Sequence, residues 1–219
     1  MDQFVDRMAF WFSQHGITEE QIRTKQAELD VASVQAHGFT TEHFPQSFVD
    51  TYEYYSDLEG RRKSRSEVEF LYKLAHSVYE MESEPYPHMP ETLHALQKAG
   101  HELCLYTGGV AEVQRRKIDR LGLEVYFDER VFIALHKNQE ALQSILKDGQ
   151  FEKARTWMIG NSLRTDILPA IENGIHSIHI PALHEWDYNN VDIHHKPQRT
   201  FVRVTSLLEV PRVINRFSI

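Results

Sequence analysis

The chain has 219 residues, of which 41% are hydrophobic and 26% are charged, and these values exclude a disordered chain. The formal net charge of -8 argues against nucleic acids and anionic membranes as partners. The lone Cys104, the acidic residues near the N-terminus and the lack of a long apolar run predict a cytoplasmic protein without disulfides.

The first 84 residues show helical periodicity and no strand signals. Thr18 and Gln21 have the spacing of a capping box at the start of a helix. Apolar side chains recur at helical spacing in two stretches: Phe4, Met8, Trp11 and Phe12, and then Val68, Leu71, Leu74, Ala75 and Val78. Residues 1–84 are therefore predicted to form a helical domain, with these side chains in its core.

From Pro85 onwards the pattern changes to alternating helices and strands. We expect helices over residues 91–98, 112–120 and 139–146 and from about Asp166, and strands over 102–106, 130–134, 156–159, 176–180 and 201–204. Such alternation is typical of a parallel sheet with helices on both faces. Residues 85–219 are thus predicted to form a Rossmann-like α/β core domain.

Polar residues follow three of the predicted strands, where ligands bind in sheets of this kind. Thr107 and Gly108 follow the first strand, and Lys137 follows the second. Asn161 follows the third strand, with Asp166 shortly beyond it. A hydroxyl, a backbone amide, an ammonium and a carboxylate at one edge suit a phosphate and a divalent cation.

These segments resemble the motifs of the haloacid dehalogenase-like hydrolase superfamily. Tyr106-Thr107-Gly108 is similar to its second motif, Lys137 to the lysine of the third, and the segment 160–166 to the fourth. The resemblance covers roughly residues 85–219, and the helical segment before them suits the α-helical cap of the family. It implies a Mg²⁺-dependent phosphatase for a small phosphorylated metabolite. Thr107 and Lys137 would then be catalytic and bind phosphate with Gly108, while Asp166 and Asn161 would hold the metal.

The sequence departs from this family pattern in two places. Asn161 stands where many members have a metal-binding carboxylate, which lowers the expected affinity for Mg²⁺. The Asp-x-Asp of the first motif, which supplies the nucleophile, occurs nowhere in the 219 residues. The first core strand is therefore expected to be missing, and the chain as given is expected to be inactive.

Three explanations of the missing motif stay open: a shortened version of a longer protein, a natural pseudoenzyme, or a strand supplied by another chain. The alternative function is a non-catalytic module that binds phosphate or a protein. A third reading, in which some of the 13 histidines bind a transition metal, is disfavoured because His176 and His179 should point to opposite faces of a strand. The sequence predicts neither the substrate nor the oligomeric state.

Overall fold

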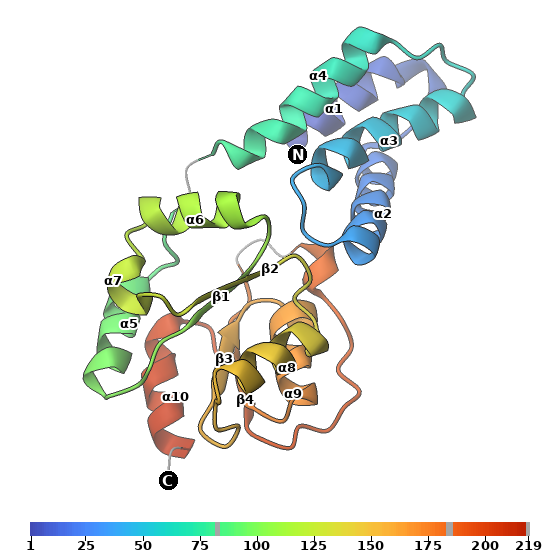
Figure 1. Ribbon diagram of the computed structural model, residues 1–219. Helices are drawn as coiled ribbons and strands as arrows, with labels where there is room; N and C mark the ends of the chain where they lie inside the picture. The colour runs from blue at the N-terminus through green and yellow to red at the C-terminus, as the bar shows by residue number, and fades with distance from the viewer. Residues whose placement is uncertain (82–83, 183–185, 218–219) are drawn as a thin grey trace. The chain divides into compact units, whose positions relative to one another are not determined.

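The computed structural model describes residues 1–81, 84–182 and 186–217. The chain divides into two compact units, Met1–Glu82 and Ser83–Ile219. Figure 1 shows helices in the first unit, and strands together with helices in the second.

The regular elements of the first unit are helical throughout residues 1–81. They are α1 Asp2–Trp11, η1 Ser13–His15, α2 Glu19–His37, α3 His43–Leu58, α4 Arg65–His76 and η2 Ser77–Tyr79. The predicted capping box is confirmed at the start of α2. The Thr18 hydroxyl accepts from the Gln21 amide at 3.2 Å, and the Gln21 side chain accepts from the Thr18 amide at 2.8 Å. Gly16 precedes it in a left-handed conformation that favours glycine.

Large apolar side chains fill the interior of the helical unit. Phe4 stacks on Phe48 of α3 with ring centroids 4.0 Å apart, and both side chains are at most 1% exposed. Tyr52 is fully buried, and its hydroxyl donates to Glu67 of α4 at 2.5 Å. Burial of one such side chain stabilises the fold by about 1.5–3 kcal/mol. The unit therefore has a closed core of its own.

The second unit confirms the predicted alternation of helices and strands. Its strands are β1 Leu105–Gly108, β2 Val131–Ala134, β3 Trp157–Gly160, β4 His176–His179 and β5 Phe201–Arg203. Its helical segments are α5 Met89–Lys98, α6 Ala111–Arg120, α7 Glu124–Phe127, α8 Gln139–Asp148, η3 Leu163–Ile167, α9 Leu168–Glu172, η4 Asp187–Asn189, η5 Leu207–Glu209 and α10 Val210–Phe217. Across the described ranges of both units, the structure contains no helix long and apolar enough to cross a membrane.

The first strand of this unit begins later than predicted. A strand over residues 102–106 was expected, whereas β1 spans Leu105–Gly108. The parallel ladder with β2 sets these bounds, because its register begins with Leu105 opposite Val131. Thr107 and Gly108 are consequently the last two residues of the strand rather than the first residues of the following loop.

The strands form two sheets where the sequence predicted one. β1 pairs with β2, and β3, β4 and β5 form a three-stranded sheet in that order, with every pair parallel. Figure 1 labels the first four of these strands. In the part of the chain that the structure describes, no ladder joins β1 to β3. All residues of β4 are buried, because β4 has a neighbour on each side, whereas those of β1, β2 and β3 are partly exposed.

Candidate functional site

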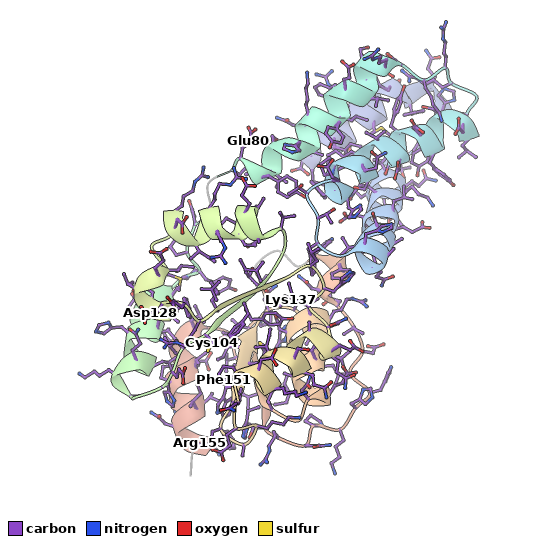
Figure 2. The ribbon with its side chains drawn as sticks, viewed as in Figure 1. Glu80, Cys104, Asp128, Lys137, Phe151 and Arg155 are labelled. Atoms are coloured by element: carbon purple, nitrogen blue, oxygen red, sulfur yellow. The ribbon has the colours of Figure 1, made fainter. Side chains whose placement is uncertain are left out.

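The structure brings two of the predicted site residues into direct contact. The Lys137 ammonium, in the loop after β2, forms an ion pair with Oδ1 of Asp166, and both side chains are nearly buried, with exposures of 11% and 7% (Figure 2 labels Lys137). The same ammonium lies 3.4 Å from the Tyr106 carbonyl oxygen of β1. Lys137 therefore links the end of the β1–β2 pair to the residues that follow β3.

The local backbone holds the Asp166 carboxylate at the end of β3. Asp166 lies in the π-helical turn η3, and its Oδ2 accepts from the Ser162 amide at 3.0 Å. A side chain on Gly160, the last residue of β3, would clash with this carboxylate. Glycine at this position therefore allows the carboxylate to fold back over the strand end.

Thr107 and Gly108 are the last two residues of β1 and follow Tyr106, whose carbonyl contacts Lys137. The Thr107 hydroxyl donates to Oε1 of Gln114 in α6 at 3.1 Å. The next residue, Gly109, has a φ of +142°, and a Cβ there would come within 2.5 Å of the Gln114 side chain. The glycine thus lets α6 return close to the strand end, and Gln114 positions the Thr107 hydroxyl.

The net charge of this cluster is close to zero, because the Lys137 ammonium and the Asp166 carboxylate form an ion pair. The Tyr106 ring packs beneath the Lys137 ammonium, whose nitrogen lies 4.8 Å from the ring centroid. Burial, and then the negative charge of Asp166, raise the pKa of the Tyr106 hydroxyl to about 12. This phenol stays protonated at neutral pH and supplies no nucleophile.

The described residues supply too few oxygen ligands for a magnesium ion. Asp166 offers one carboxylate, which is already bonded to Lys137 and to the Ser162 amide. The Asn161 backbone carbonyl accepts from Nε2 of His179 at 2.9 Å, and the Asn161 side chain is neutral. Within the ranges that the structure describes, no three His, Cys, Asp or Glu residues gather where they could hold a metal. The present residues therefore do not fit a tight Mg²⁺ site.

His176, His179 and Cys104 of the second unit pack within the fold. Nε2 of His176 lies 3.0 Å from the Ala154 carbonyl oxygen. The His176 ring stacks on the Trp157 ring, with the two centroids 4.4 Å apart. His176 and His179 are both buried residues of β4, where the sequence predicted a strand. Cys104 is half-buried one residue before β1, and burial raises the pKa of its thiol, so the thiol is a poor nucleophile at neutral pH.

Sequence reasoning missed one arginine that anchors a loop beside the site. Arg164, two residues before Asp166, donates to the Tyr188 carbonyl at 2.5 Å and to the Asn190 carbonyl at 3.2 Å. Its guanidinium lies over the Tyr188 ring, 5.0 Å from the centroid. No pattern in the sequence indicates this contact beyond the placement of an arginine within the fourth-motif segment.

A comparison with protein-family models shows to which family the chain belongs. The family model described as haloacid dehalogenase-like hydrolase matches residues 33–180, more than half of the chain. The chain belongs to the haloacid dehalogenase-like hydrolase family. This membership agrees with the resemblance predicted from the Thr107, Lys137 and Asp166 segments.

Solved structures of the family have the same fold. A haloacid dehalogenase-like family hydrolase from Xanthomonas campestris superposes with a TM-score of 0.75 at 18% identity, over 99% of this chain and 83% of that chain. A putative HAD-hydrolase from Bacillus subtilis, determined bound to magnesium, gives a TM-score of 0.61 at 20% identity, over 97% of this chain and 92% of that chain. At these identities the likeness shows the fold alone.

One curated relative has a described activity. A glyceraldehyde 3-phosphate phosphatase of Methanothermobacter thermautotrophicus is 31% identical over 98 residues. The aligned segment is 43% of this chain and 43% of the relative. The match therefore spans less than half the length of that phosphatase.

Proposed function

We propose that this member of the family is a phosphatase-type protein for a small phosphorylated metabolite. Its phosphate site would be formed by Thr107, Gly108 and Lys137. The observation that carries the proposal is the convergence of Lys137, the β1 strand end and Asp166 at one point of the α/β unit. The phosphatase activity of the curated relative supports the same substrate class.

The Lys137 ammonium has a donor left for a phosphate oxygen. An ammonium carries three N–H donors, and the Tyr106 carbonyl and the Asp166 carboxylate engage two of them. The Gly109 amide bonds to the Ala134 carbonyl at 3.0 Å, whereas the Gly108 amide lies on the opposite edge of β1 and has no recorded partner within the described ranges. Lys137 and Gly108 can thus donate to a phosphate without a change of backbone.

Turnover needs a nucleophile that this chain does not contain. The resemblance to the family implies phosphoryl transfer to a carboxylate of an Asp-x-Asp motif, and this motif does not occur in the 219 residues. Asp166 is bonded to Lys137 and to Ser162, and the pKa of Tyr106 is raised, so neither replaces it. We therefore expect binding of phosphate without hydrolysis of phosphate esters.

A second candidate function is a non-catalytic module that binds phosphate or a protein. The neutral Asn161 and the direct Lys137–Asp166 pair favour this candidate, because both lower the affinity for a catalytic cation. In such a module, Lys137 and Gly108 would keep the role of binding the anion.

Phosphate binding can be tested by titrating the chain with inorganic phosphate and following backbone NMR shifts. We expect the Gly108 amide to shift in the parent chain and to remain unchanged in Lys137→Ala. Lys147→Ala is the matched control, because Lys147 is an exposed lysine of α8. Equal shifts in the Lys137→Ala variant would contradict the proposed site.

Turnover can be tested with p-nitrophenyl phosphate and Mg²⁺. The 219-residue chain should give a background rate, and the same chain preceded by an apolar strand ending in Asp-x-Asp should be faster by about two or more orders of magnitude. If the added motif gives no activity while phosphate still binds, the non-catalytic module is the correct reading. Robust turnover by the original chain, abolished in Asp166→Ala, would refute the assignment of the nucleophile.

A further inference from the structure

The Thr107 hydroxyl at the end of β1 commits its hydrogen to a neighbouring side chain. It donates to Oε1 of Gln114, the fourth residue of α6, at 3.1 Å. A hydroxyl has one O–H donor and otherwise only acceptor lone pairs. In this arrangement Thr107 therefore presents lone pairs to any further group at the strand end. A phosphate oxygen is itself an acceptor and cannot use the hydroxyl as it is oriented.

Gln114 reaches Thr107 because of the way that α6 begins. Its backbone amide bonds to the Val110 carbonyl at 3.0 Å, which places it in the first turn of the helix. Long side chains of a helix point back toward the helix N-terminus, and here that direction leads to the end of β1. Gly109 lies between the two elements and leaves room for the side chain, since a Cβ there would be 2.5 Å from Nε2 of Gln114.

The Gln114 side chain carries a donor beside the acceptor that it uses. Nε2 lies close to Gly109, and among the residues that the structure describes it has no hydrogen-bond partner. The last torsion of a glutamine is broad and roughly two-fold. Half a turn about it exchanges Oε1 and Nε2 and leaves every other heavy atom in place. The same residue can therefore hold the Thr107 hydroxyl either as an acceptor or as a donor.

We propose that Gln114 is a positioning residue for phosphate and that its side-chain amide reverses when the anion binds. Nε2 then donates to Oγ1 of Thr107, and the hydrogen of Thr107 turns to a phosphate oxygen. The hydroxyl joins the Lys137 ammonium and the Gly108 amide as a third donor to the anion. This inference rests on the phosphate site proposed above, and it adds the residue that decides whether Thr107 accepts or donates.

The reversal can be observed in the full chain without any substitution. Inorganic phosphate is titrated, and NMR follows the Gly108 amide and the two Nε2 hydrogens of Gln114. Because one Nε2 hydrogen enters a hydrogen bond, it should shift and exchange with water at least about threefold more slowly as phosphate saturates. A shift of Gly108 without a change at Nε2 would overturn the role of Gln114 alone. An unchanged Gly108 amide would overturn the phosphate site and this inference with it.

A methionine at position 114 separates positioning from mere competition for the hydroxyl. Gln114→Met should weaken phosphate binding by about fivefold, because the hydroxyl loses the hydrogen bond that directs it. Unchanged or tighter binding would overturn the proposal. In a Thr107→Val background the same substitution should have no effect, and an equal effect in both backgrounds would also overturn it. Gln143→Met, at an exposed glutamine of α8, is the matched control and should leave the affinity unchanged.

A glutamate at position 114 adds a readout that depends on pH. An ionised carboxylate only accepts, so Gln114→Glu should bind phosphate at least about tenfold more weakly than the parent chain at neutral pH. The ratio of the two affinities should shrink as the pH falls below about 4.3, the ordinary pKa of glutamate, because the protonated carboxyl donates to Thr107. Both chains contain Lys137 and Asp166, so the ratio reports on position 114. A ratio that stays constant with pH would overturn the proposal.

The Thr107→Val background separates this effect from charge repulsion. Without the hydroxyl, only repulsion between the carboxylate and phosphate remains, so Gln114→Glu should weaken binding by a factor at least about threefold smaller than in the parent chain. A loss of the same size in both backgrounds would show that Gln114 does not act through Thr107, which would overturn the proposal.

Discussion

The helical unit and the α/β unit differ in how completely their interiors are closed. In the helical unit the side chains of Phe4, Met8, Phe12 and Tyr52 have no measurable exposure. In the α/β unit every residue of β1, β2 and β3 is partly exposed, and only β4 is buried along its whole length. Parallel sheets are normally covered on both faces and paired inside, so the second unit is the incomplete one.

The contrast has a physical origin in the two kinds of secondary structure. A helix satisfies its backbone hydrogen bonds internally, so a helical unit needs only side-chain packing to close. An inner strand needs a neighbour on each side, and within the described ranges β4 has two neighbours whereas β1, β2, β3 and β5 have one each. The candidate site residues Lys137 and Asp166 lie at the ends of these two strands, beside their unpaired edges.

The largest expected effect concerns the closed core. Phe48→Ala should destabilise the helical unit by about 4 kcal/mol, because Phe48 is 1% exposed and stacks on Phe4. Urea unfolding followed through the fluorescence of Trp11, the tryptophan of this unit, measures the loss. Phe10→Ala is the matched control, since Phe10 is 71% exposed, and it should change the stability by less than about 0.5 kcal/mol. Equal effects would show that the core is not closed as described.

The next effect concerns the ion pair at the open edge. Lys137→Met should destabilise the α/β unit by about 3 kcal/mol, because it leaves the Asp166 carboxylate nearly buried without its partner. The double variant Lys137→Met with Asp166→Asn should lose less than the sum of the two single variants. Urea unfolding, followed through the fluorescence of Trp157, measures the loss of stability in the single variants and in the double variant. Additive losses would mean that the two side chains do not interact.

A smaller, pH-dependent effect is expected in the helical unit. Arg61 bonds to both oxygens of Glu67 at 2.7 Å, and this pairing, with the Tyr52 hydroxyl bond, lowers the pKa of the Glu67 carboxyl below its ordinary 4.5. Glu67→Gln should cost about 2 kcal/mol at neutral pH. A carboxylate with a lowered folded pKa stabilises the fold above its unfolded pKa and loses this contribution as the pH falls.

The difference between the parent chain and Glu67→Gln should therefore shrink as the pH falls below about 4.5. Thermal unfolding of both chains across this range measures it. The exposed pair of Lys25 and Glu28 supplies the control, because Glu28→Gln should change the stability by less than about 0.5 kcal/mol at any pH. A difference that stays constant with pH would contradict the pairing of Glu67.

Much of the fold could be predicted from the sequence because local signals carry it. The capping box of Thr18 and Gln21 and the alternation of strands and helices depend on neighbouring residues. The bounds of β1 could not be predicted, because the ladder with β2 sets them and a ladder is not a local property. The division into two sheets could not be predicted for the same reason, because it depends on which strands pair with one another.

For the candidate site, the sequence predicted which polar residues lie at the strand ends but not the contacts between them. Strand ends identified Thr107, Lys137, Asn161 and Asp166 as polar residues at one edge. Their spacing could not show that Lys137 bonds to Asp166, since the two residues are far apart in the chain and a π-helical turn sets the carboxylate. The phosphate and metal roles of these residues stay predictions.

The most direct test of the open edge is hydrogen exchange of the unmodified chain alone. In β1, the Thr107 amide should be protected through its ladder with β2, whereas the Tyr106 and Gly108 amides should exchange at least about tenfold faster. In β3, Met158 should be protected and Ile159 should exchange as fast as Gly108. Alternating protection along both strands is the result we expect. Uniform protection along β1 and β3, independent of protein concentration, would contradict an open edge within the α/β unit.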